Sequence, residues 1–188
     1  MNSKIEERFD YKGYPCVVMF QPMGFRTGYV GVPKESILYG RNSTVLNTIL
    51  ECHGGVTYTD SRLYGQEDEN TWWVGFDCGH AWDGYDADTT WKYFRKDISD
   101  YKGIYDGEIR TKYYVETQCR HLVEQIQDAN NMTELDIVIR VMESSYEDMS
   151  DVAVKYLKEY RSKLEKEKTV TVLSNNPFKE AGVIISFS

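Results

Sequence analysis

The stretch WWVGFDCGHAWDGYD, residues 72–86, joins an apolar run to a turn that is rich in polar side chains. Its first part, residues 72–76, combines tryptophan, valine and phenylalanine in the way that is typical of a buried strand. We therefore expect a strand, then a polar turn over residues 77–83 that either stabilises the fold or holds a metal. From Gly84 onward we expect an acidic and aromatic surface.

Short β-like runs alternate with turn signals through the rest of the first half. The expected strands are residues 9–11, 14–20, 28–32, 55–59 and 71–76. Lys12-Gly13 provides the first turn, Pro33 ends the third strand, and a polar loop over residues 60–70 joins the last two. Residues 43–50 fit either a strand or a short helix. A small, bent antiparallel sheet is the natural assembly of these strands.

Helical spacing begins near Thr111. One apolar stripe predicts a helix that ends near residue 130 and packs on the sheet; it consists of Val115, Cys119, Leu122 and Ile126. Thr133 is expected to cap a second helix whose apolar side holds Leu135, Val138, Ile139 and Met142. Ser150 is expected to cap a third, with a stripe of Ala153, Tyr156, Leu157, Tyr160 and Leu164. Residues 169–173 and 182–187 are β-like again.

These patterns predict an α+β fold. The N-terminal half forms a small bent antiparallel sheet with a packed helix, and two further helices and a β-like tail follow. We expect an α+β core domain over residues 1–130 and a helical extension with the tail over residues 131–188.

Composition narrows the classes of function. The 188 residues have a net charge of −8. Residues 60–108 alone carry 12 acidic and 5 basic side chains, a balance of −7, so nearly all the excess lies in one segment. Such a segment repels nucleic-acid backbones and attracts basic protein surfaces or cations, unless it is only a solvated loop. No apolar run of membrane-spanning length and no secretory leader are visible, so we expect a cytoplasmic protein without membrane contact.

Two of the three histidines adjoin or lie near cysteines, which suggests a metal site. The chemically admissible ligands are His53, Cys78, His80 and Asp83. Cys52 and His53 can hardly both bind one ion, because neighbouring residues of an extended strand point to opposite faces. Their spacing matches no established zinc motif, and the four cysteines lack a CxxC pair, so free thiols and a satisfied polar core are the favoured alternative. We expect no cofactor, with zinc left open.

Catalysis by a cysteine nucleophile is a further alternative for the same residues. Cys78 would attack, His53 or His80 would act as base, and Asp77 or Asp83 would orient that base. The carboxylates of Asp83, Asp86 and Asp88 suggest Mg²⁺ or Ca²⁺, but the spacing lacks the glycine and glutamate of a calcium loop. Phosphate-binding loops and a basic stripe for nucleic acid are absent from the sequence.

Three ordered motifs resemble a family of small phage and prophage proteins. They are GYVGVP at residues 28–33, HGGVTY at residues 53–58 and WWVGFDCGHAWD at residues 72–83. A helix like that around Tyr113-Tyr114 follows, so the resemblance covers about residues 8–126. The positions that match the family's recurring polar residues are His53, Cys78, His80 and Asp83. Within this class the chain is similar to type II-A anti-CRISPR proteins.

The resemblance implies a phage-type inhibitor, not an enzyme, that binds the RNA-guided effector nuclease of its bacterial host and blocks target DNA binding or cleavage. The basic channels of such a nuclease would suit an acidic, aromatic surface. We expect the partner contacts to include Asp68, Glu69, Trp82, Tyr85, Asp86, Asp88 and Trp91. Two alternatives stay open: a Cys/His/Asp-centred metal-dependent or cysteine hydrolase acting on a nucleotide-like compound, and a module that sequesters a small signalling molecule.

Overall fold

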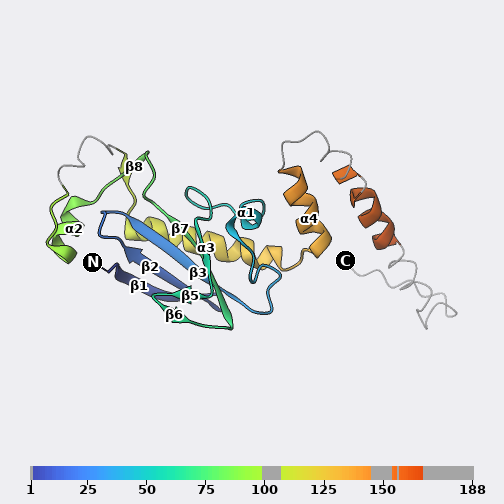
Figure 1. Cartoon of the computed structure of the whole chain (residues 1–188), viewed down its shortest axis with the longest axis horizontal. Coiled ribbons are helices and arrows are strands. Elements are labelled where there is room, and N and C mark those ends of the chain that lie inside the picture. The colour runs from blue at the N-terminus through green and yellow to red at the C-terminus, as the bar shows by residue number, and fades with distance from the viewer. Residues whose placement is uncertain (1, 99–106, 145–153, 156, 167–188) are drawn as a thin grey trace. The chain divides into compact units, whose positions relative to one another are not determined.

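The computed structural model describes residues 2–98, 107–144, 154–155 and 157–166 (Figure 1). The chain divides into two compact units, Met1–Thr133 and Glu134–Ser188. Each unit is treated separately below, and the candidate site lies in the first.

A five-stranded sheet organises the first unit (Figure 1). Its strands lie in the order β1-β2-β3-β7-β4, and every neighbouring pair is antiparallel. The bounds are β1 Lys4–Tyr11, β2 Tyr14–Phe20, β3 Arg26–Pro33, β7 Thr71–Asp77 and β4 Tyr58–Asp60. The α+β fold expected from the sequence is therefore confirmed. Strand β7, which carries Trp72 and Trp73, pairs with β3 on one side and β4 on the other, so it lies inside the sheet.

The hairpin of β1 and β2 shows two local features that the sequence explains only in part. Its turn is at Lys12-Gly13, as predicted, with φ of 51° and 83°; two positive φ values suit the twist of a tight hairpin. The pairing then shifts between Ile5 and Glu7, which leaves Glu6 as the extra residue of a β-bulge. A bulge redirects the side chain that it carries.

Helix α3, Lys112–Ala129, covers one face of the sheet (Figure 1). Thr111 caps it through a hydrogen bond from the Tyr114 N–H to its side chain. The stripe predicted from the sequence is buried, together with Val123 and Ala129. On β2, Val17 and Met19 are buried, and so are the alternate residues Cys16, Val18 and Phe20, so the sheet has cover on both sides.

The second face of the sheet carries a smaller cluster. Val17 and Met19 pack there with Leu63, and Ile5, Tyr29, Tyr58 and Trp73 flank them. Leu63 belongs to a short hairpin of β5, Arg62–Leu63, and β6, Gln66–Glu67, within the segment that we expected to be an irregular loop. This small hairpin buries apolar side chains that the helix does not reach.

Several short elements differ from the sequence-based expectation. The ambiguous segment 43–50 begins with helix α1, Ser43–Leu46, which Asn42 caps. Strand β4 begins only at Tyr58, because Gly54 and Gly55 both have positive φ and interrupt an extended backbone. Two further features were not expected from the sequence. They are helix α2, Ala87–Phe94, and the parallel pair of β8, Asp83–Gly84, with β9, Glu108–Ile109.

In the second unit, α4 spans Glu134–Glu143 and begins next to Thr133, as expected. It buries Ile137 and Ile139, whereas Val138 is 44% exposed, so the predicted apolar side was partly wrong. Six of its ten residues are apolar, and such a helix offers more than one apolar stripe. Residues 154–155 and 157–166 are helical, and Arg161 pairs with Asp136 at 2.5 Å. The expected cap Ser150, the stripe residues Ala153 and Tyr156, and the β-like tail lie outside the described residues.

Candidate functional site

Asp83 is the centre of a buried polar cluster at one end of the sheet. It begins β8, and its side chain has no exposed surface. Oxygen Oδ2 lies 2.8 Å from His53 Nε2, 3.3 Å from His80 Nδ1 and 3.1 Å from the backbone nitrogen of His80. Oxygen Oδ1 accepts a 3.1 Å hydrogen bond from Nε of Arg110. One carboxylate therefore joins three segments that are distant in sequence.

His53 is fixed at both ring nitrogens. While Nε2 faces Asp83, Nδ1 lies 3.0 Å from the Tyr114 hydroxyl on the first turn of α3. An ionised carboxylate only accepts hydrogen bonds, so a neutral His53 carries its hydrogen on Nε2 and accepts at Nδ1 from Tyr114. The side chain of His53 is only 6% exposed. The imidazole is therefore held in one orientation.

His80 approaches the cluster from the polar turn that follows β7. Its ring stacks on Trp82 with a centroid distance of 4.7 Å and an interplanar angle of 8°. Gly54 also borders this ring, because a Cβ atom there would come within 1.9 Å of the imidazole. Gly54 also has φ of 67°, a conformation that favours glycine. Gly54 thus gives the loop room for the His80 ring, whereas Gly55 borders the Asn47 side chain.

The charges around Asp83 favour its ionised form. Burial acts to raise the pKa of Asp83, but hydrogen bonds from His53, Arg110 and the backbone N–H of His80 together bring it below the ordinary value. Arg110 also lies over the Tyr114 ring, 5.0 Å from its centroid. Among the described residues, every buried side-chain nitrogen and oxygen has a hydrogen-bond partner. The cluster is therefore stable as a polar core.

The structure separates Cys78 from the other three predicted ligands. Ligand atoms of His53, His80 and Asp83 all lie within 4.8 Å of one another, and this group does not include Cys78. Cys78 is 1% exposed, and burial raises the pKa of its thiol to about 12. All four cysteines are free. A protonated, buried thiol is a poor nucleophile, so the geometry gives little support to cysteine catalysis.

A cleft of about 380 Å³ opens beside His53. Its lining combines the loop before Gly54 with the outer side of α3 and includes Cys52, Tyr114, Gln118 and His121. His53 and Tyr114 both line the cleft and belong to the Asp83 cluster. Burial raises the pKa of the Cys52 thiol to about 12, so the cleft presents no thiolate.

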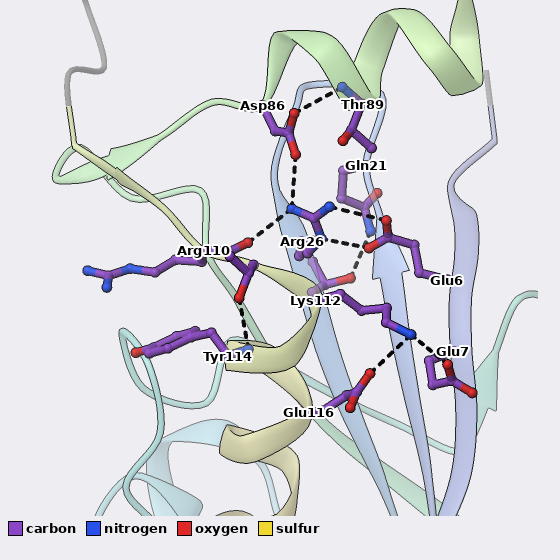
Figure 2. A network of polar contacts seen from close by, with 12 residues as sticks. Glu6, Glu7, Gln21, Arg26, Asp86, Thr89, Arg110, Lys112, Tyr114 and Glu116 are labelled. Atoms are coloured by element: carbon purple, nitrogen blue, oxygen red, sulfur yellow. Dashed lines mark hydrogen bonds and ion pairs between the residues drawn. The ribbon is translucent and has the colours of Figure 1, made fainter.

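A second polar network lies next to the cluster and fixes the ends of four elements (Figure 2). Arg26 of β3 donates from Nε to Glu6 at 2.6 Å and from Nη1 to Asp86 at 3.2 Å and to the Arg110 carbonyl at 3.0 Å. The side chains of Arg26 and Glu6 are 8% and 5% exposed. Figure 2 shows the Arg110 side chain pointing away from Arg26, toward Tyr114. The backbone carbonyl of Arg110 thus belongs to the Arg26 network, and its guanidinium belongs to the Asp83 cluster.

The predicted partner-binding residues do not form one surface. Asp68 and Glu69 precede β7, whereas Trp82, Asp88 and Trp91 follow it, so the strand's seven residues, roughly 20 Å, separate the two sets. Two further residues of the predicted partner-binding set make contacts within the fold. Asp86 caps α2 and pairs with Arg26, and the Tyr85 ring packs against Phe25.

The comparisons with known proteins identify no relative. Neither protein-family models, nor curated proteins, nor solved structures give a match to this chain. The helices described by the structure include none that is long and apolar enough to cross a membrane. Function must therefore be argued from the site and the surface.

Sequence reasoning missed Arg110 and Tyr114, which hold Asp83 and His53. Arg110 is 27 residues from Asp83 along the chain, and Tyr114 is 61 residues from His53. No local pattern signals contacts over such separations. The helical spacing of apolar residues predicted only which side of α3 is buried. Tyr114 lies at the edge of that buried side.

Proposed function

We propose that the protein acts by binding another protein through one end of its sheet, and that this partner is the RNA-guided effector nuclease of a type II CRISPR system. The supporting observation is a group of exposed apolar side chains, here called the aromatic end: Met23, Trp82, Trp91, Ile109 and Tyr113. Their exposed fractions run from 41% at Met23 to 76% at Tyr113. Of the large apolar side chains exposed on the described part of the first unit, only Tyr64 lies elsewhere.

Rigid elements hold the aromatic end together. Asp86 donates its backbone N–H to the Gly24 carbonyl at 2.8 Å, which joins the start of α2 to the turn between β2 and β3. The parallel pairing of β8 and β9 places Gly84 opposite Ile109. Exposed tryptophans on rigid supports are suited to anchor a protein interface, because little conformational freedom is lost on binding.

Charge supports a basic partner. Asp88 and Glu108 are exposed beside the aromatic residues and belong to the acidic segment 60–108, although Lys92 and Arg95 are exposed there too and Glu108 pairs with Arg110. An acidic rim increases the rate of association with a surface rich in arginine and lysine, such as the channel that holds the guide–target duplex. On this proposal the protein acts in the cytoplasm of a bacterial host and contacts the nuclease rather than DNA. The choice of this partner rests on the motif resemblance.

The test is size-exclusion chromatography of the protein with a guide-loaded type II nuclease, together with a DNA cleavage assay. We expect a complex and loss of cleavage at excess protein. The double variant W82A/W91A should lose both, whereas Y64A, which removes an exposed aromatic side chain elsewhere, should retain them. Absence of a complex together with unchanged cleavage would overturn the proposal.

Metal-dependent hydrolysis of a nucleotide-like compound is the second candidate. One observation favours it, the convergence of His53, His80 and Asp83 within 4.8 Å. Two imidazoles and a carboxylate leave a coordination position for water, as catalytic zinc sites do. A screen of nucleotides with metal-loaded protein tests it, with H80Q as the inactive control. Turnover that H80Q retains would contradict this mechanism.

A further inference from the structure

We infer that His53, His80 and Asp83 bind one divalent transition-metal ion, and that Zn²⁺ is the ion that their ligand types fit. They contribute one nitrogen each from two imidazoles and one carboxylate oxygen, all within 4.8 Å of one another. Zinc in proteins takes this combination and completes its tetrahedron with water. The inference does not depend on which protein the aromatic end binds.

The two distances to Asp83 require only small movements, whereas the histidine nitrogens, which lie within 4.8 Å of each other, must approach by up to about 1.5 Å. Zinc–ligand bonds of about 2.0–2.1 Å imply about 3.3 Å between neighbouring ligands of a tetrahedron. His80 Nδ1 already lies 3.3 Å from Oδ2 of Asp83. His53 Nε2 lies 2.8 Å from the same oxygen, so it must withdraw by about 0.5 Å. Loop 52–55 carries this histidine and borders the cleft, which gives the ring space to do so.

Each ligand has a supporting partner that is not itself a ligand. Tyr114 contacts the second nitrogen of His53, Arg110 holds the second oxygen of Asp83, and Trp82 stacks on His80. Supports of this kind orient metal ligands and increase affinity. With a metal on Nε2, the hydrogen of His53 moves to Nδ1, where the oxygen of Tyr114 accepts it and its hydroxyl turns toward the cleft.

The same geometry disfavours some ions and excludes one of the predicted ligands. Two imidazoles disfavour Mg²⁺ and Ca²⁺, which prefer all-oxygen sites. Arg110 binds Oδ1 and leaves Oδ2 to face the histidines, so its positive charge lies on the side of Asp83 away from the proposed ion. Cys78 is excluded as a ligand, because its sulfur lies outside the group of converging atoms.

The first experiment is calorimetric titration of chelator-treated protein, prepared without a histidine tag, with ZnCl₂. We expect one site per chain. H80Q should weaken binding by more than about tenfold, since even the loss of a supporting residue costs 10–100-fold. His121 supplies the matched control, because it is the third histidine, lines the neighbouring cleft and is not among the converging ligands. H121Q should bind as the wild type does.

The second experiment identifies the ligands without relying on a variant. Co²⁺ in place of Zn²⁺ should give the visible absorption of a four- or five-coordinate ion and lack the near-ultraviolet charge-transfer band of a thiolate ligand. A thiolate band would overturn the ligand set by adding a cysteine. Equal zinc affinity of wild type and H80Q, or no binding at all, would overturn the site, whereas either result leaves nuclease binding unaffected.

Discussion

Glu6, the extra residue of the bulge in β1, makes a two-point contact with Arg26 of β3 across the intervening strand β2. Arg26 Nε lies 2.6 Å from Oε2 and Nη2 lies 3.2 Å from Oε1 (Figure 2). Regular pairing of β1 would place the residue after Ile5 opposite β2, and the bulge instead frees Glu6 to reach Arg26. An irregularity in the strand thus supplies the charge that a buried arginine requires.

Replacing Arg26 with methionine should destabilise the first unit strongly. The change leaves two carboxylates, Glu6 and Asp86, buried without their cation, which costs about 3–5 kcal/mol. Urea unfolding measures the loss. K112M is the comparison, because Lys112 also joins β1 to the start of α3 but is 42% exposed, so its ion pairs should add little. Equal effects of the two variants would contradict the role given to Arg26.

Tyr114 and Tyr113 provide a test of the hydrogen bond to His53. Y114F removes the donor and leaves a largely buried imidazole nitrogen unpaired, which should cost about 1–3 kcal/mol. Y113F removes a hydroxyl from a side chain that is 76% exposed and should leave the free energy of unfolding unchanged. Thermal unfolding of both variants provides the measurement, and an unchanged midpoint for Y114F would show that the bond adds nothing.

Alanine substitutions at Gly54 and Gly40 distinguish the cost of backbone strain from the cost of a steric clash. Both have positive φ, 67° and 74°, so alanine carries a similar backbone cost of about 1–2 kcal/mol at either position. Only at Gly54 does the added methyl group meet the His80 ring, whereas nothing lies within 4 Å of it at Gly40. We expect G54A to lose more stability than G40A and to shift the imidazole resonances of His80 in NMR spectra. Equal losses with unshifted resonances would argue against close packing.

Acid should weaken the contact between the hairpin turn and α3. Hydrogen bonds from Tyr11 and Lys12 lower the pKa of Glu124 below its ordinary value of 4.5. A carboxyl with a lower pKa in the folded state stabilises the fold above its unfolded pKa, and that contribution is lost as the pH falls through the folded pKa. Stability measured from pH 7 downward should therefore fall less steeply in E124Q than in the wild type. Parallel curves would contradict the assignment.

The sequence predicted elements whose signals are local. Short β-like runs bounded by turn signals located β2, β3 and β7, and the spacing of Val115, Cys119, Leu122 and Ile126 located α3 and its buried side. Three of the four predicted metal ligands do converge, because His80 and Asp83 share the turn after β7 and Gly54, next to His53, leaves room for the His80 ring. Contacts between residues that are far apart in the sequence could not be predicted. Examples are the contacts of Arg110 with Asp83 and of Arg26 with Glu6. Likewise, strand β7 separates Asp68 and Glu69 from Asp88, which composition alone cannot reveal.

The position of α3 in the chain has a consequence for synthesis. Strands β1 to β3 are complete at Pro33, whereas the helix that covers them begins at Lys112. At a synthesis rate of about 5–20 residues per second, the three strands β1 to β3 therefore leave the ribosome well before helix α3 has been made. During those seconds the apolar face with Val18, Val30 and Val32 is open to solvent. Slow translation or early termination before residue 112 should therefore promote aggregation, and a chaperone is expected to find its binding site on this face of the nascent chain.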